Sequence, residues 1–213
     1  REGIARLPVA GGDVGALYRQ CGELLAQTGE LEEAIMVLRE GIARLPVVKE
    51  VGALYQSCGE ILARAGKPEE AIIVLREGIA RLPAAGGQVG VLYQSWGEIL
   101  ARVGKTEEAI MVLQEGVARL LVANSVILYQ SWGEILARVG KTEEAIIVLQ
   151  EGIARLPAAR SAMLYQSWGE ILVQAGKTEE EIIVLQEGIA RVALGKNYSK
   201  LYTFLSQLMT LRP

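Results

Sequence analysis

The side chains that could do chemistry in this chain are copied at regular intervals, which limits the chemistry open to them. Serine recurs as Ser95, Ser131 and Ser167 within the same run of residues. The sequence has no histidine, so these hydroxyls lack the commonest general base and the chain lacks the commonest metal ligand. Catalytic carboxylate pairs need two different environments to take different roles, whereas each glutamate here is repeated in equivalent surroundings. We therefore expect no enzyme activity, no catalytic residue, no metal site and no cofactor.

The two cysteines, Cys21 and Cys58, are also expected to be inert. They stand at the position that Trp96, Trp132 and Trp168 occupy later in the chain, which predicts a place in the packed interior. A buried free thiol behaves as a small apolar group, and two cysteines do not make a disulfide framework.

Composition argues against nucleic acid and membranes as partners. Lys plus Arg is 22 and Asp plus Glu is 25, so the net charge is 22 − 25 = −3, without the basic surface that either partner attracts. No apolar run approaches the ~18 residues of a membrane helix. The chain opens at Arg1 with neither a starting Met nor a signal-peptide pattern. We expect a cytoplasmic fragment of a longer protein.

Tyrosine marks an internal repeat. The marker residues follow one another at steps of 37, 38, 36, 36 and 37: Tyr18, Tyr55, Tyr93, Tyr129, Tyr165 and Tyr202. Between them the text barely changes, and the run Leu92–Lys105 returns unaltered as Leu128–Lys141. A period of this length predicts a solenoid, in which each unit packs on its neighbours.

Each repeat divides into two helical stretches, and no strand pattern is found. Apolar residues at helical spacing run from Leu92 to Val103, and Gly104 then ends the first helix. Glu107 and Glu108 open the second helix, where the macrodipole favours acid. The predicted helix pairs are 14–46, 51–83, 89–121, 125–157 and 161–193, between a partial second helix at 1–8 and an unpaired helix at 197–211.

The repeat resembles the tetratricopeptide family. The matching residues are Tyr93, Trp96, Gly97, Leu100, Ala109, Leu113 and the proline equivalent to Pro157. The units are slightly longer than the ~34 residues of the family, tyrosine replaces its usual tryptophan, and Gly116 and Gly152 replace an alanine. The resemblance implies an all-α, right-handed superhelix of antiparallel helix pairs. It also implies that the first helices line a concave groove that contacts a ligand peptide.

A polar stripe on the first helices is the candidate partner-binding surface. Its residues stand at i, i+4 and i+8 and so share one helix face: Gln56, Glu60, Arg64, Gln94, Glu98, Arg102, Gln130, Glu134, Arg138, Gln166 and Glu170. Arg19-Glu23-Gln27 is a variant at the N-terminal end. Two interpretations stay open. Either the stripe contacts a partner, or Glu98 and Arg102 pair as an ordinary solvated helix surface worth a few tenths of a kcal/mol.

Glycine inside the helices predicts close packing. Ten such sites would cost roughly 5–10 kcal/mol relative to alanine, so we expect each to allow two helices to approach. The residues expected to pack at these contacts are Gly97, Ala109, Gly133, Ala145, Gly169, Trp96, Trp132 and Trp168. The tryptophans share this core stripe, which favours packing over base stacking. Glu181 replaces the alanine expected to face Gly169, so we expect a looser last repeat or a carboxylate that reaches solvent.

These features together predict a protein-interaction scaffold that binds a peptide or another protein. The alternative is a ligand-sensing or regulatory arm of a larger signalling protein of the nucleotide-switch type. The complementary chain ends at 1–8 and 197–211 also predict head-to-tail self-association.

Overall fold

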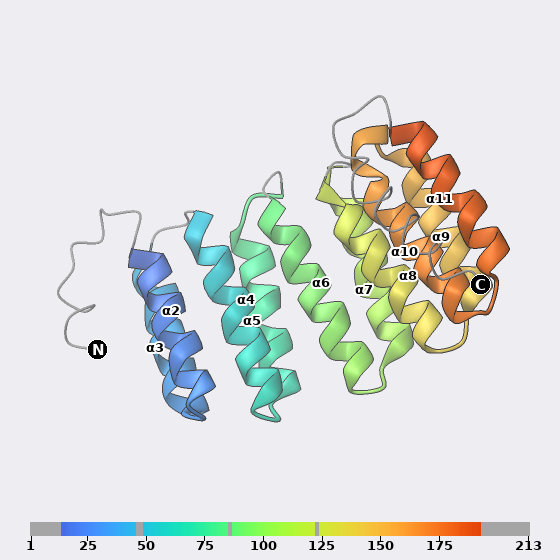
Figure 1. Cartoon of the computed structure of the whole chain (residues 1–213). Helices are drawn as coiled ribbons and strands as arrows, with labels where there is room; N and C mark the ends of the chain where they lie inside the picture. The colour runs from blue at the N-terminus through green and yellow to red at the C-terminus, as the bar shows by residue number, and fades with distance from the viewer. Residues whose placement is uncertain (1–13, 46–48, 85–86, 122–123, 193–213) are drawn as a thin grey trace. The chain divides into compact units, whose positions relative to one another are not determined.

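A computed structural model describes residues 14–45, 49–84, 87–121 and 124–192 (Figure 1). All regular secondary structure in these ranges is helical, as predicted. The expected partial helix at 1–8 and the expected terminal helix at 197–211 lie outside the described residues, and so does the self-association that rests on them.

The described residues form five helix pairs, each joined by a short turn (Figure 1). The pairs are α2 (Val14–Gln27) with α3 (Leu31–Arg44), α4 (Lys49–Arg64) with α5 (Pro68–Arg81), α6 (Gly87–Arg102) with α7 (Thr106–Arg119), α8 (Val126–Arg138) with α9 (Thr142–Arg155), and α10 (Ala162–Gln174) with α11 (Thr178–Val192). A 3-10 turn, η2 (Ala158–Arg160), precedes α10. Helices α4 and α6 begin two residues earlier than predicted, because the links before them join their first turns.

The second helices end where a proline follows. Leu45, Leu82 and Leu156 have extended backbones, with ψ of 137°, 145° and 148°. Each precedes a proline, whose ring disfavours the helical conformation in the residue before it. The amide of each leucine still donates to the carbonyl of the helical glycine four residues earlier, so the helix closes with its last donor satisfied.

The turns inside each pair require glycine. The residues with positive φ, between 74° and 90°, are Gly29, Gly66, Gly104, Gly140 and Gly176. At Gly66 the chain reverses and the amide of Lys67 donates to the carbonyl of Leu62 at 2.9 Å. Only glycine adopts this left-handed backbone without strain, which confirms the turns predicted from sequence.

Contacts divide the chain into two compact units, Arg1–Val112 and Leu113–Pro213, with the boundary inside α7. In the first unit α4 contacts both α2 and α6, so the first helices form one layer, while α3 packs on α2 and α4. In the second unit α8 contacts α10, and α9 packs on both. The fold class of each unit is all-α and solenoidal, as expected.

The core follows the repeat. The marker tyrosines Tyr18, Tyr55, Tyr93, Tyr129 and Tyr165 are at most 2% exposed. A methyl group added to Gly152 of α9 would lie 2.7 Å from Cγ of Tyr129, so the second-helix glycine makes room for the tyrosine ring. This close contact explains why glycine replaces the family's alanine at that position.

The first-helix glycines face a different residue from the one predicted. A methyl group added to Gly133 would lie 3.0 Å from Leu149, and Gly22 and Gly59 likewise face leucine on the second helix. The alanine expected as their partner, represented by Ala145, is fully buried but is not the nearest group. The larger leucine fills the notch that the missing side chain leaves.

Glu181 of α11 is buried, and the expectation that it could reach solvent is wrong. Its exposed fraction is 0%, and neither carboxylate oxygen has a hydrogen-bond partner. The contact at Gly169 is wider than at Gly133, with the nearest atom of Leu185 at 3.3 Å from a methyl group added there. The wider spacing agrees with the expectation of a looser last pair, because a glutamate occupies more volume than alanine.

Candidate functional site

The polar stripes of three first helices meet in one groove of the first unit. Helix α4 lies between α2 and α6, and its Gln56, Glu60 and Arg64 lie one helical turn apart on a single face. The groove has a volume of about 360 Å³ and is lined by Glu23, Gln27, Ser57, Glu60, Ile61, Arg64, Ser95, Glu98, Ile99 and Arg102. The stripe predicted from sequence therefore borders a real concavity in this unit.

The groove has a buried floor and charged walls. Ile61 is 2% exposed and Ile99 is 3% exposed, and Ser95, which also lines the groove, is buried. Glu60 and Arg64 are exposed, like most of the wall. The floor is rigid because it belongs to the core, whereas the charged side chains of the walls are available to contact a bound ligand.

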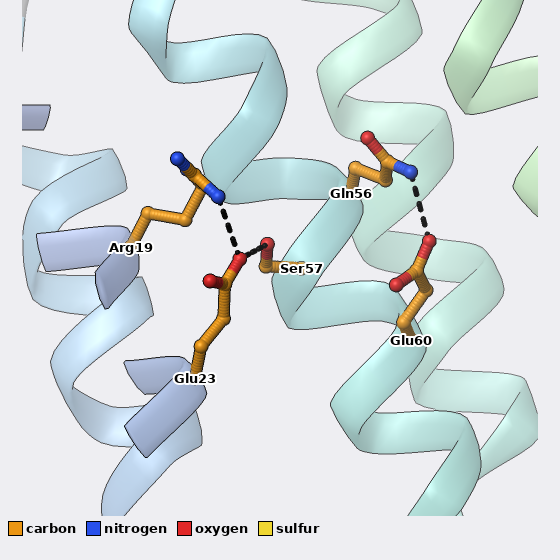
Figure 2. A network of polar contacts seen from close by, with 5 residues as sticks. All are labelled: Arg19, Glu23, Gln56, Ser57 and Glu60. Atoms are coloured by element: carbon orange, nitrogen blue, oxygen red, sulfur yellow. Dashed lines mark hydrogen bonds and ion pairs between the residues drawn. The ribbon is translucent and has the colours of Figure 1, made fainter. Parts of the chain in front are cut away.

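Neutral amide groups, not arginines, bind most of the groove carboxylates. Nε2 of Gln56 donates to Oε1 of Glu60 at 2.8 Å (Figure 2), and Gln94 donates in the same way to Glu98 at 2.8 Å. These i, i+4 bonds orient each carboxylate through a neutral donor.

Glu23 of α2 is the exception. Nη1 of Arg19 lies 2.9 Å from its Oε1, and Oγ of Ser57 donates to the same oxygen at 3.3 Å (Figure 2). The second bond joins α4 to α2, so Glu23 both links neighbouring repeats and has its charge balanced by Arg19.

The arginines of the groove are not engaged by its glutamates. Arg64 and Arg102 make no hydrogen bond or ion pair with any residue of the described ranges. The sequence-based alternative, in which Glu98 pairs with Arg102, is therefore wrong for this structure. Gln94 reaches the carboxylate of Glu98 from the preceding turn, and Arg102 extends toward solvent.

The second unit repeats the same motif. Gln130 donates to Glu134 at 2.8 Å on α8, and Gln166 donates to Glu170 at 2.9 Å on α10. Arg138 is exposed at the end of α8, while α10 has Gln174 at the equivalent position. The glutamates of the stripe thus occur in both units. Among the described first helices, its arginines continue only as far as Arg138 of α8.

The tryptophans are half-buried and stack on the marker tyrosines. The ring centroids of Tyr129 and Trp132 are 6.4 Å apart, and the pair Tyr165 and Trp168 is 6.3 Å apart. Trp96 stacks on its tyrosine at 6.3 Å and has the guanidinium of Arg76 5.7 Å from its ring centroid. The indole Nε1 atoms are buried, so these rings are partly covered packing residues. Gly97 and Ala109 are buried in the first unit.

The two cysteines differ. Cys58 is fully buried, and burial raises the pKa of its thiol to about 11. Cys21 is half-buried and lines a separate surface depression with Leu17 and Leu24 of α2. The prediction of a packed interior is right for Cys58 and wrong for Cys21, because α3 covers the equivalent face of α4 while the same face of α2 stays partly exposed.

A tyrosine–glutamate–arginine triad is the polar feature that sequence reasoning missed. Tyr55 donates its hydroxyl to Glu77 at 2.8 Å, and Nη1 of Arg81 donates to the same hydroxyl at 2.7 Å. Burial first, and the bond to Glu77 second, raise the pKa of Tyr55 to about 12. Tyr18 makes the same two bonds with Glu40 and Arg44. The sequence signal for this triad is a constant spacing, since the glutamate follows the tyrosine by 22 residues and the arginine follows it by 26 residues.

Two kinds of site are not found among the described residues. In the ranges that the structure describes, no group of three or more Cys, Asp or Glu side chains could hold a metal ion. None of the described helices has the length and apolar character needed to cross a membrane.

Comparisons with known proteins identify the fold. No protein-family model matches the sequence, and no curated protein matches it either. Solved structures do match. The nearly identical TPR-like repeats of a protein described as a kinesin light chain from Podosopora anserina share 16% identity over 85% of this chain and 96% of that one, with a TM-score of 0.55.

Two further structures agree. PilF of Pseudomonas aeruginosa shares 16% identity over 92% of this chain and 84% of that one, with a TM-score of 0.53. A chain of the APC/C hetero-tetramer Cut9-Hcn1 shares 15% identity over 98% of this chain but only 38% of its own length, with a TM-score of 0.54. Together with the repeat motif, these matches show that the chain has the fold of tetratricopeptide-repeat proteins.

Proposed function

We propose that this chain is a protein-interaction scaffold, and that its first unit holds an extended segment of a partner protein in the groove across α2, α4 and α6. The observation that carries this proposal is the groove itself. It is one continuous concavity, and every lining residue belongs to the first helices of three successive repeats.

The dimensions of the groove suit a short extended segment. Its volume of about 360 Å³ falls in the usual range of ligand sites, roughly 300–1,000 Å³. Neighbouring helices pack about 8–10 Å apart, so crossing three of them takes about 16–20 Å, or roughly five or six extended residues at ~3.3 Å each.

Two of the carboxylates that line the groove are held by neighbouring side chains. Glu60 is held by Gln56, and Glu23 is held by Arg19 and Ser57. Ordering side chains on binding costs about 0.5–1.5 kcal/mol for each flexible group. A wall whose carboxylates are fixed before the partner arrives avoids part of that cost.

The same features explain why a scaffold is preferred to other functions. The groove contains carboxylates, guanidinium groups, amides and hydroxyls without a histidine, a set suited to recognition. The net charge of −3 makes protein a better partner than nucleic acid or an anionic membrane. Two free cysteines fit a reducing, cytoplasmic location. No feature of the described residues favours the regulatory-arm alternative.

Affinity capture tests the proposal. The chain is compared with the double variant Glu60→Lys/Glu98→Lys, which reverses charge in the groove. The control Glu69→Lys/Glu143→Lys reverses two exposed acids on second helices, and circular dichroism verifies the fold of each variant.

Partners retained by the parent and the control, but lost by the groove variant, are expected. Peptide arrays of such a partner should then confine binding to one segment of about five or six residues. Capture of the same proteins by all three chains would show that the groove is not the binding surface.

A further inference from the structure

We propose that α2 has a second interaction surface, and that this surface binds the helix pair α10–α11 of another copy of this chain. The surface is a depression of about 440 Å³ on α2, lined among others by Leu17, Cys21 and Leu24. None of its lining residues lines the groove across α2, α4 and α6, so binding there is independent of the proposed function.

The apolar residues of this surface have buried counterparts on every later first helix that the structure describes. Leu17 is 38% exposed, whereas the leucines at the same position of the later first helices are 0% exposed: Leu54, Leu92, Leu128 and Leu164. Leu24 is 61% exposed, whereas the isoleucines at its position are at most 4% exposed: Ile61, Ile99, Ile135 and Ile171. Helix α2 therefore exposes the residues that the other repeats bury between helices, and an exposed apolar patch marks an interaction site.

The second helix of the preceding repeat covers the leucine. A methyl group added to Gly41 of α3 would lie 3.1 Å from Cδ1 of Leu54. The same contact recurs between Gly78 of α5 and Leu92, at 2.8 Å. No second helix precedes α2 among the described residues, so Leu17 lacks this glycine.

The first helix of the preceding repeat covers the other side of the surface. Helix α2 contacts α4, and Oγ of Ser57 on α4 donates to Oε1 of Glu23 on α2 at 3.3 Å. Ser57 lies one helical turn before Ile61 on the same face, so α2 lies over this side of α4. Covering the α2 surface in the same way therefore takes a complete helix pair, with a first helix over Leu24 and a second helix over Leu17.

The pair α10–α11 has the complementary surface. Gln186–Arg191 of α11 has the same sequence as Arg39–Arg44 of α3 except at its first residue. Ile189 is only partly buried, whereas the isoleucines at its position are at most 7% exposed: Ile42, Ile79 and Ile153. The three atoms nearest to a methyl group added to Gly188 all belong to Tyr165. A leucine of the following first helix is among the three at the earlier glycines of this position: Gly41, Gly78 and Gly152.

A second copy of the chain completes both surfaces at once. Leu17 of one copy packs on Gly188 of the other, as Leu54 packs on Gly41, and α10 covers Leu24. The segment Arg1–Pro8 has the sequence of the end of a second helix, but it is too short to supply the first helix that covers Leu24. Each copy contributes a different surface to the contact, so the association is head to tail.

Sedimentation velocity of the full chain over a series of concentrations tests the proposal. The average mass of the parent should rise with concentration. Leu24→Lys places a charge where the second copy must exclude water, and Ile189→Lys does the same on the other surface. Each variant should weaken the association by at least about tenfold.

Ile183→Lys is the matched control. It has the same charge change on the same helix as Ile189→Lys, but Ile183 is 63% exposed, and its counterparts Ile73 and Ile147 are 63% and 62% exposed. Neighbouring repeats do not cover this position, so the control should associate like the parent. Circular dichroism verifies the fold of all three variants. Leu24→Lys alone tests the contact if Ile189→Lys does not fold, because Leu24 is already exposed.

A mixture of the two surface variants tests the direction of the contact. Leu24→Lys keeps the α10–α11 surface intact, and Ile189→Lys keeps the α2 surface intact. Each variant alone should remain monomeric where the parent associates. An equimolar mixture should form a complex of two chains and grow no further.

Cys21 provides a second measurement because it lines the α2 surface. Its thiol is half-buried in the separate molecule, whereas Cys58 at the same position of α4 is fully buried. The rate at which a thiol reagent modifies Cys21 should therefore decrease as the associated fraction of the parent increases. In Leu24→Lys the rate should not depend on protein concentration.

Three results would overturn the proposal. One is a parent that stays monomeric at every concentration, and protection of Cys21 in that monomer would assign the cover to residues of the same molecule. Another is a Cys21 rate in the parent that stays constant while the chain associates. The third is association of Ile189→Lys as strong as that of the parent, because the contact would then not involve α11.

Discussion

Tyr55 and Gly78 approach each other so closely across the pair α4–α5 that a methyl group on Gly78 would lie 2.7 Å from Cγ of the tyrosine ring. The adjacent residue, Glu77, accepts the hydrogen bond of the same tyrosine. The ring of Tyr55 therefore packs closely against Gly78, while its hydroxyl forms a hydrogen bond with the residue next to that glycine. The tolerance of each glycine to substitution depends on which atom it faces.

Gly78→Ala should destabilise the protein even though alanine is the better helix former. The new methyl group would overlap the ring of Tyr55, and overpacking of this kind costs about 1–3 kcal/mol. The gain in helix propensity is about 0.5–1 kcal/mol, so we expect a net loss of about 1–2 kcal/mol in urea unfolding monitored by circular dichroism.

Gly169→Ala is the matched comparison. The nearest atom to a methyl group there is the flexible end of Leu185, at 3.3 Å, so we expect unchanged stability or a gain of up to about 1 kcal/mol. Equal losses at the two positions would mean that helical glycine is required for a reason other than space.

Tyr55→Phe should remove about 1 kcal/mol of stability. The variant keeps the packing of the ring but loses the bonds to Glu77 and Arg81, and both partners are exposed enough to regain water. Thermal unfolding of the two proteins at neutral pH measures the difference.

The difference between Tyr55→Phe and the parent should decrease at alkaline pH. The pKa of Tyr55 is raised from 10.0 to about 12 in the folded chain, so its hydroxyl contributes fully below pH 10 and loses its contribution as the pH rises through that window. A constant gap between the melting temperatures of parent and variant across this window would contradict the role assigned to the hydroxyl.

Glu181→Ala should stabilise the second unit at neutral pH. Burying a polar group without a hydrogen-bond partner costs about 1–3 kcal/mol in proteins, and alanine is the residue that the other repeats have at this position. Glu180→Ala serves as the control, since this side chain is 58% exposed and its ion pair with Lys177 spans 3.6 Å. We expect that control to change stability by less than about 0.5 kcal/mol.

The benefit of Glu181→Ala should depend on pH in a defined direction. Burial raises the pKa of Glu181 above its ordinary 4.5, so the folded state holds this proton more tightly than the unfolded state. The parent is therefore most stable relative to the variant below pH 4.5. Its stability relative to the variant then decreases as the pH rises through the folded-state pKa of Glu181. Parallel pH profiles for the two proteins would argue against a buried carboxylate.

The two thiols should react at very different rates. Cys58 is 0% exposed, and burial raises its pKa to about 11, whereas Cys21 is half-buried. We expect an aromatic disulfide reagent to modify Cys21 readily in the native protein and Cys58 only after denaturation. Variants with serine at one position or the other assign the signals, and rapid native modification of the Cys21→Ser variant would be inconsistent with the packing around Cys58.

Some of these features follow from the sequence, and others depend on contacts between helices. The turn at Gly66 and the helix end at Leu82 are local effects of glycine and proline, so spacing alone predicts them. The stripe on α4 is predictable too, since Gln56, Glu60 and Arg64 share a face by helical periodicity.

The partners within the stripe were less accessible from sequence. Glu60 has Gln56 one turn before it and Arg64 one turn after it, and both can reach its carboxylate. Spacing does not decide between them, whereas the structure shows the bond to Gln56. Similarly, Gly133 could face any small or apolar residue of α9, and the way the two helices pack selects Leu149.

The polar triads were missed for a related reason. Tyr129 and Glu151 belong to different helices and are 22 residues apart, a separation that the periodicity of a single helix does not reveal. The burial of Glu181 also depends on a contact between helices, because it is set by how α10 packs on α11. The sequence shows that glutamate replaces alanine at this position, but it does not show where the side chain lies.

The triad of Tyr55, Glu77 and Arg81 lies entirely within one helix pair. Because hydroxyl, acid and base are inherited together, a whole repeat could be duplicated or deleted without leaving a buried tyrosine hydroxyl unpaired. Genetic changes of one full period should therefore be far better tolerated than insertions of a few residues. The identity of Leu92–Lys105 and Leu128–Lys141 is what growth of the array by such duplication would produce.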